Sequence, residues 1–278
     1  MGTHTKPVFI VGSGRSGTRT MFRMLTGAEG LEIHHEYLCN AIQRIAARYY
    51  MGLTSEDEAK RLIAPLHGAA IHYASDAVWA DSSNKLSWLI RPLGEMFPTA
   101  KFLAIVRDGR KVTSSFYYKL REEMYDDDSV EILRTWLRDQ VSLPEPPPEK
   151  RYWWNIPRSD QFLGSAFPNF DRLRRVAWHW AENCREITER FAELPDDRVK
   201  LVRLEELTRD EELLKRTIDF IGIDYDPVYS DYLQTPRNVF VPIDFQLTRA
   251  QEAAFQEIAG PMMTRMGYVG EKAYHVSY

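Results

Sequence analysis

A short apolar run that leads into a glycine-rich turn stands near the start of the chain, at residues 7–22, PVFIVGSGRSGTRTMF. β-Branched runs of this length bounded by glycine are typical of buried parallel strands, and residues 16–26 have helical spacing. The glycines at 12, 14 and 17 allow a tight turn in which successive amides and a helix N-terminus face one anion. The stretch therefore predicts a strand, a phosphate-binding loop and a helix.

The alternation of strand and helix recurs along the chain. Further strands are expected at 78–83, 101–109 and 199–207, each followed by a helix, and further helices at 38–50, 55–74, 175–191 and about 248–266. Alternating elements of this kind form right-handed βαβ units around a parallel sheet. We therefore expect an α/β protein with a P-loop-type three-layer fold, in which helices flank a central parallel sheet, and one domain over residues 1–278.

An insertion rich in proline and aromatic residues interrupts this pattern at about 125–175. The proline density, as in PEPPPEK at 144–150, predicts irregular structure. Two interpretations remain open, a surface excursion or a substrate lid, because the segment contains many aromatic residues for a solvated loop. The candidate substrate contacts are Tyr37, Trp153 and Trp154, whereas Trp178 and Trp180 are expected in the core.

Composition excludes several classes of protein. Hydrophobic residues make up 44% of the chain and the net charge is −4, which argues against a disordered chain and, weakly, against a nucleic-acid binder. No apolar stretch is long enough to span a bilayer, and MGTHTKP is unlike a signal peptide. The two cysteines, Cys39 and Cys184, stand far apart in helical segments, so no disulfide framework is expected. These features predict a cytoplasmic protein.

The loop lacks the lysine of magnesium-dependent nucleotide hydrolases. Gly12 and Gly17 have the hydrolase spacing, but Thr18 stands where the lysine would be, and the basic residues are Arg15 and Arg19. Without the lysine and the hydroxyl residue that follows it, the usual magnesium site is lost. The loop therefore favours metal-free transfer of an anionic group over nucleotide hydrolysis.

A second group of polar residues follows the strand at 101–109, in VRDGRKVTSSFYYK at 106–119. Arg107 lies at the carboxyl end of that strand, where ligands gather in open α/β sheets, and Ser115 and Lys119 share a face of the next helix. The three side chains predict a second anion pocket. The alternative is a salt-bridged strand end, in which Arg107 or Arg110 pairs with Asp108.

These two motifs resemble those of sulfotransferases that use 3′-phosphoadenosine 5′-phosphosulfate (PAPS), especially the tyrosylprotein sulfotransferase-like and bacterial branch. GRSGT at 14–18 is similar to the family loop that binds the 5′-phosphosulfate, and Arg107 with Ser115 is similar to the motif that binds the 3′-phosphate. LVRLEEL at 201–207 and the tail from residue 235 are weaker similarities. The resemblance implies these cofactor-binding residues: Gly14, Arg15, Ser16, Gly17, Thr18, Arg19, Thr20, Arg107, Ser115, Lys119, Arg237 and Asn238.

The resemblance also implies catalytic roles for Glu36, Lys85, Arg15 and His34. Glu36 lies 21 residues after Arg15, where the tyrosylprotein branch has its proposed base, and Lys85 follows Asn84 as in the family's transition-state lysine. His34 is an alternative base, expected on the face of Glu36 if the strand alternation continues. The alternatives are purely structural roles: Glu36 as a carboxylate at a helix N-terminus and Lys85 as a solvated residue in the first turn of a helix.

The expected function is in-line transfer of the sulfuryl group from PAPS to a hydroxyl or amine of a small molecule or glycan, with 3′-phosphoadenosine 5′-phosphate (PAP) as product and no metal. We expect no nucleic-acid partner and no membrane span, and a homodimer is left open. The alternatives are a P-loop nucleotide-dependent kinase or GTPase and a non-catalytic nucleotide-binding protein of the same fold.

Overall fold

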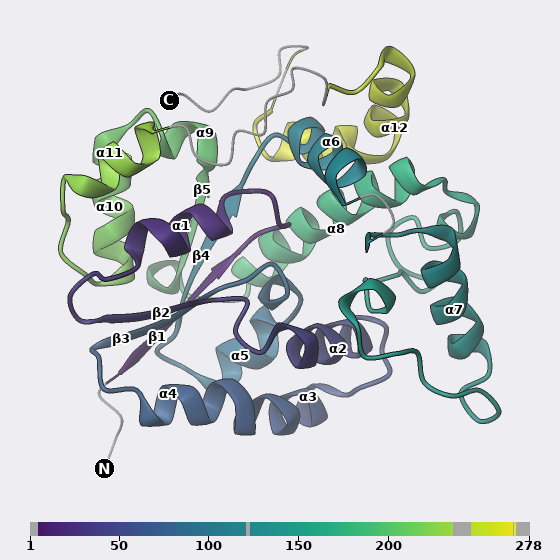
Figure 1. The fold of residues 1–278 in the computed structure, drawn as a ribbon, viewed down its shortest axis with the longest axis horizontal. Coiled ribbons are helices and arrows are strands. Elements are labelled where there is room, and N and C mark those ends of the chain that lie inside the picture. The colour runs from purple at the N-terminus through teal and green to yellow at the C-terminus, as the bar shows by residue number, and fades with distance from the viewer. Residues whose placement is uncertain (1–4, 121–122, 236–245, 269, 271–278) are drawn as a thin grey trace.

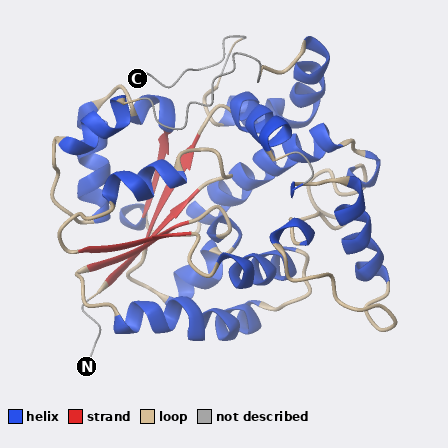
Figure 2. Ribbon diagram, in the orientation of Figure 1, coloured by secondary structure: helices blue, strands red, loops and turns tan. Residues whose placement is uncertain are grey.

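The computed structural model describes residues 5–120, 123–235, 246–268 and 270. Within them, five parallel strands form one sheet in the order β2-β3-β1-β4-β5 (Figure 1). The strands are β1 (Lys6–Val11), β2 (Leu31–His35), β3 (Val78–Ser82), β4 (Lys101–Val106) and β5 (Val199–Arg203). Helices pack on both faces of the sheet (Figure 2), so the expected α/β fold with a central parallel sheet is confirmed.

The strands are buried on both faces, which is why they appear in the sequence as continuous apolar runs. Alternate residues of β1 enter different cores: Phe9 and Val11 join the larger core, whereas Val8 and Ile10 join the smaller one. The smaller core includes residues of α1 (Thr18–Leu25), α10 (Glu211–Ile221) and α11 (Val228–Gln234). The two cores separate the three layers of the fold.

The larger core lies between the opposite face of the sheet and most of the remaining helices. It takes in residues of α2 (Cys39–Tyr50), α3 (Glu56–Ile63), α4 (Ala69–Tyr73), α5 (Ile90–Met96), α6 (Gly109–Lys119), α7 (Asp127–Arg138), α8 (Arg172–Phe191) and α12 (Arg249–Arg265). Trp178 and Trp180 of α8 are fully buried there, as expected. No helix of the described part of the chain is both long and apolar enough to cross a membrane.

Several predicted element boundaries differ from those in the structure. The strand expected at 199–207 ends at Arg203, because residues Leu204–Leu207 form the short helix α9. The helix expected at 55–74 is divided into α3 and α4 by a π-helical segment, Ala64–Gly68, which contains a proline. A helix interior does not accommodate proline without local distortion, which accounts for the division.

The insertion at 125–175 is more regular than predicted. Helix α7 begins after Asp126, whose side chain accepts a hydrogen bond from the Ser129 amide. The prediction of irregular structure was wrong there because the prolines are concentrated at 144–148, after the helix has ended. The insertion packs into the larger core through Trp136, Trp153 and Phe167, so its aromatic residues act in part as core residues.

The packing beneath α6 makes Gly109 a sensitive position. A Cβ atom at Gly109 would lie 2.7 Å from the Trp180 ring and 2.8 Å from Phe255. We expect Gly109→Ala to lower the free energy of unfolding by about 1–3 kcal/mol, because both rings are buried and must shift. Gly68→Ala is the matched control, since its nearest neighbour would be 3.8 Å away. Urea unfolding of both variants tests this, and equal stabilities would contradict the packing account.

Candidate active site

The predicted phosphate loop, residues 12–17, connects β1 to α1 at the carboxyl ends of the strands. Its backbone is left-handed at Gly14, Arg15 and Gly17, with φ of 81°, 55° and 117°. A Cβ atom at Gly14 would lie 2.7 Å from Nδ2 of Asn84, so only glycine fits there. Oγ of Ser16 is buried without a hydrogen-bond partner. The loop therefore has the tight turn that an anion cradle requires and a polar atom that a bound anion would satisfy.

The residues of the second motif lie beside this loop. Nε of Arg15 donates a 2.9 Å hydrogen bond to Oγ of Ser115, and Nη1 of Arg107 donates to the carbonyl of Arg15 at 3.4 Å. Nε of Arg107 is buried without a hydrogen-bond partner. The structure thus brings Arg15 together with Arg107 and Ser115, which follow it by 92 and 100 residues in the sequence.

Positive charge is concentrated at this point. Desolvation and the neighbouring Arg107 and Arg19 lower the pKa of Arg15, and desolvation with Arg15 and Arg107 lowers the pKa of Lys119. The salt-bridged alternative applies to Arg110, which pairs with Asp108 at 2.8 Å, whereas Arg107 points to the loop. Because the mutual repulsion of these cations favours a bound anion, the arrangement fits a phosphate group.

A strained turn after β2 presents Glu36 to the site. Glu36 and Leu38 are left-handed, with φ of 53° and 48°, a conformation that costs a non-glycine residue about 1–3 kcal/mol. The Glu36 amide donates to the carbonyl of Ser82, and the Tyr37 amide donates to Oδ1 of the buried Asp81. The other oxygen of Asp81 lies 2.9 Å from Nε2 of His67. The end of β3 therefore maintains the turn.

The same turn separates His34 from Glu36. Nε2 of His34 lies 2.8 Å from Oε1 of Glu32, and Nδ1 of His35 lies 2.7 Å from the Ser82 carbonyl. The expectation that His34 shares a face with Glu36 does not apply, because the left-handed residue ends the strand alternation. The helix-cap role considered for Glu36 is also absent, since α2 has no side-chain cap.

The buried Lys85 forms an ion pair with the partly buried Glu36. Its Nζ atom lies 3.4 Å from Oε1 of Glu36, contacts Oδ1 of Asn84, and stands 5.1 Å above the Trp154 ring. Only 3% of the Lys85 side chain is exposed, so the alternative of a solvated first-turn lysine does not apply. Burial and the charge of Lys150 lower the pKa of Lys85 to about 7, although Glu36 opposes the shift.

The carboxylate of Glu36 is strongly stabilised in its charged form. Burial alone raises the pKa of Glu36, but Lys85, Lys150 and His35 outweigh burial and lower that pKa to about 2. Lys150 was not predicted from sequence, since it ends the proline-rich PEPPPEK and no spacing connects it to the other motifs. Its Nζ atom lies 3.4 Å from Oε2 of Glu36.

The predicted substrate contacts have different environments. Trp153 is fully buried against Trp136, so it presents no surface to an acceptor in this structure. Trp154 is also buried, but its ring faces the Lys85 and Lys150 amino groups. Tyr37 is partly buried, edge-on to His67 and Trp79.

His179 connects the phosphate loop to the insertion, and no sequence pattern indicated this. Nε2 of His179 lies 3.1 Å from the Ser13 carbonyl, and Nδ1 lies 3.2 Å from the hydroxyl of Tyr125. That hydroxyl donates to the Asn155 carbonyl, next to Trp154. Complete burial, together with Lys85 and Lys150, lowers the pKa of His179 to about 3. His179 is therefore a neutral link between the two segments.

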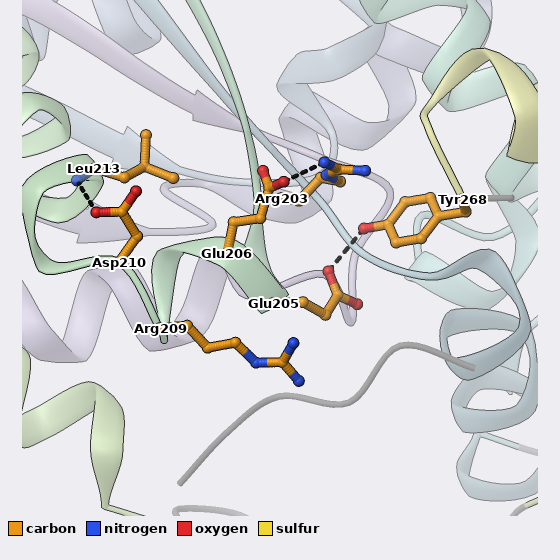
Figure 3. Close-up of a pocket in the computed structure, with 7 residues that line it drawn as sticks. All are labelled: Arg203, Glu205, Glu206, Arg209, Asp210, Leu213 and Tyr268. Atoms are coloured by element: carbon orange, nitrogen blue, oxygen red, sulfur yellow. Dashed lines mark hydrogen bonds and ion pairs between the residues drawn. The ribbon is translucent and has the colours of Figure 1, made fainter. Parts of the chain in front are cut away.

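The remaining predicted cofactor-binding residues lie in α1 or outside the described part of the chain. Thr18 and Thr20 are in the first turn of α1, Thr18 buried and Thr20 half-buried, and Arg19 between them is exposed. Arg237 and Asn238 lie outside the described residues. A cavity of about 400 Å³ is lined by residues of β5, α9, α10 and the segment between these two helices, together with Tyr268 (Figure 3). Glu205 accepts hydrogen bonds there from Tyr268 and from the Asp108 amide. None of the predicted site residues that the structure describes lines this cavity.

The neutral state of His179 predicts a pH dependence of stability. Its folded-state pKa lies below the ordinary value of 6.5, so its contribution is present above pH 6.5 and is lost as the pH falls toward 3. The loss should reach ~1.4 kcal/mol per pH unit. In urea unfolding between pH 7 and 4, His179→Gln should show a smaller decline than the parent protein, and His72→Gln, at an exposed position, the same decline. Equal slopes for the parent and His179→Gln would contradict the assignment.

Several solved structures are similar to this chain. The sulfotransferase STF9 from Mycobacterium avium is 12% identical, with a TM-score of 0.50, over 98% of this chain and 79% of that chain. The sulfotransferase domain from the curacin biosynthetic pathway is 14% identical, with a TM-score of 0.49, over 96% and 99%. Mouse sulfotransferase SULT7A1, complexed with PAP, is 15% identical, with a TM-score of 0.45, over 93% and 85%.

A search of curated proteins finds no match. The sequence model of the Sulfotransferase family matches residues 7–146, which include the phosphate loop, Glu36, Lys85 and the second motif. The matched segment is half of the 278-residue chain. The chain therefore belongs to the sulfotransferase family.

Proposed function

We propose that this sulfotransferase takes the sulfuryl group from PAPS and transfers it to a hydroxyl or amine of a small molecule or glycan. The observation that carries the proposal is the partly buried Glu36–Lys85 pair, since a carboxylate and a lysine stand together beside a cationic loop. A carboxylate can accept the acceptor's proton, and a lysine can neutralise charge on the transferred group.

The phosphate loop and the second motif are suited to the two phosphate-bearing ends of PAPS. The loop amides and Arg15 would hold the 5′-phosphosulfate, and Arg107, Ser115 and Lys119 the 3′-phosphate. The unpartnered, buried Oγ of Ser16 and Nε of Arg107 support this fit, because buried polar atoms usually have partners. When bound, PAPS supplies an activated sulfuryl group and a phosphate leaving group.

Transfer would proceed in line. The acceptor oxygen or nitrogen forms a bond to sulfur while the bond from sulfur to the 5′-phosphate oxygen breaks, and the acceptor's proton passes to Glu36. While two lysines hold its carboxylate, Glu36, with a pKa of about 2, is a weak base. Movement of Lys85 toward the transferred group would release Oε1 of Glu36 and strengthen the base at the point of reaction.

The alternatives make different predictions. A kinase or GTPase of this fold would bind ATP or GTP with magnesium, but Thr18 occupies the position of the loop lysine. A non-catalytic nucleotide-binding protein would have no use for the Glu36–Lys85 pair, whose burial costs hydration energy. We therefore favour metal-independent sulfuryl transfer.

PAP binding tests the donor site. We expect PAP to bind equally in the presence and absence of EDTA, and Arg107→Ala to weaken binding about 10- to 100-fold, because a charge-assisted hydrogen bond contributes ~1.5–3 kcal/mol. Arg61→Ala, an exposed arginine on α3, is the control and should bind as the parent does. Isothermal titration calorimetry measures both. Failure of the parent protein to bind PAP would refute the proposal.

Transfer of label from [³⁵S]PAPS to a metabolite extract tests the base. Glu36→Gln should lower the rate by about 10²- to 10⁴-fold without loss of PAP affinity, because no general base remains to take the proton of the attacking hydroxyl or amine. His34→Gln should stay close to the parent rate, since His34 contacts Glu32 rather than Glu36. The opposite result, with His34→Gln inactive and Glu36→Gln active, would assign the base to His34. Mass spectrometry of the labelled product identifies the acceptor.

A further inference from the structure

The carboxylate of Glu36 has two lysine neighbours from different parts of the chain. Lys85, after β3, lies 3.4 Å from Oε1, and Lys150, from the insertion, lies 3.4 Å from Oε2. Both amino groups face the ring of Trp154, at 5.1 Å and 5.6 Å from its centroid. Each carboxylate oxygen therefore has its own cation, and the three charged groups carry a net charge of +1.

The backbone around Lys150 is fixed by buried groups. Nε2 of Gln43, on α2, donates to the carbonyls of Lys150 and Trp153 at 3.1 Å and 2.9 Å, and Gln43 is itself buried. Nε1 of Trp154 donates to the Glu123 carbonyl at 2.8 Å. These bonds hold the start of the Lys150 side chain at a fixed distance from the turn that carries Glu36.

The stability of the fold does not account for this lysine. Its side chain is 37% exposed, and a partly exposed ion pair contributes about 0–1 kcal/mol. Lys85, by contrast, is almost fully buried on the side of Asn84, which lies against the phosphate loop at Gly14. The two lysines thus come to Glu36 from different segments of the chain, one next to the loop and one in the insertion.

We propose that Lys150 is a positioning residue for Glu36, which holds Oε2 in place when Lys85 turns from Oε1 to the transferred group. The proposal rests on the function proposed above. It makes the insertion part of the transfer site, through a lysine rather than through an aromatic surface. With Oε2 held, the free oxygen Oε1 remains directed at the acceptor's proton.

Three titratable groups face the carboxylate: Lys85 from the segment after β3, Lys150 from the insertion and His35 from β2. All three lower the pKa of Glu36. Removal of the Lys150 charge should therefore raise that pKa, and the effect should be absent when arginine replaces the lysine.

The experiment combines a titration with a rate measurement. Carboxyl ¹³C NMR follows the titration of Glu36 in the parent protein and in the variants Lys150→Gln, Lys150→Arg and Lys6→Gln. Lys6→Gln is the matched control, because it removes a lysine charge at the amino end of β1, whereas Glu36 lies beyond the carboxyl ends of the strands. We expect an upward shift of the Glu36 titration in Lys150→Gln alone. Lys150→Gln should also lower kcat about 10- to 100-fold, the effect of a misplaced reacting group, with PAP affinity unchanged and activity largely restored in Lys150→Arg.

A double-mutant cycle separates this role from a structural one. If Lys150 acts through Glu36, Lys150→Gln should cause no further loss of rate in a Glu36→Gln background. The proposal would be overturned if the rate losses of Lys150→Gln and Glu36→Gln multiply in the double variant. An unshifted Glu36 titration or an unchanged kcat in Lys150→Gln would also overturn it. Loss of PAP affinity in Lys150→Gln would place Lys150 in the donor site instead and would also overturn it. If the proposed function itself is wrong, the result is different, because the parent protein then does not bind PAP.

Discussion

The carboxyl end of β3 is the point on which the candidate site depends. The Ser82 carbonyl accepts the Glu36 amide, the Ser82 hydroxyl donates to the Thr18 carbonyl at 2.7 Å, and Asp81 accepts the Tyr37 amide. Just beyond the strand, the Ser87 hydroxyl accepts the Gly12 amide and donates to the Gly12 carbonyl. One strand end therefore sets the position of the phosphate loop relative to the turn that carries Glu36.

Positive and negative groups are unevenly distributed around this point. The loop side concentrates arginine and lysine, whose crowding lowers the pKa of Arg15 and of Lys119, whereas Glu36 is the carboxylate that Lys85 and Lys150 share. Such an arrangement is costly to bury without an anion. An incoming phosphosulfate would relieve the repulsion between the cations and compete with Glu36 for Lys85. Donor binding and activation of the base would then be coupled through one lysine.

Short-range patterns in the sequence predicted the fold and the loops well. The strand, loop and helix at 7–26 follow from glycine positions and apolar periodicity, and the parallel sheet follows from their repetition. The proximity of Arg15, Arg107 and Ser115 followed from the rule that ligands gather at the carboxyl ends of parallel strands. Glu36 and Lys85 required the family resemblance, because neither has a distinctive local pattern.

The remaining features depend on contacts between distant segments. Lys150 reaches Glu36 across 114 residues, and His179 reaches Ser13 across 166, so neither has a local signal. His34 and Glu36 were expected on the same face of a strand, but the backbone is left-handed at residue 36. The sequence gives no sign of this conformation, because the residue there is not a glycine. The burial of Trp153 has no signal in the sequence, because an aromatic side chain in a proline-rich segment does not reveal whether it faces solvent or the core.

A crystal structure of the complex with PAP tests the central claim most directly. The account predicts the 5′-phosphate in the loop at residues 12–18, the 3′-phosphate against Arg107 and Ser115, and Nζ of Lys85 closer to the 5′-phosphate than to Glu36. PAP bound elsewhere, or bound in the reverse orientation, would contradict it.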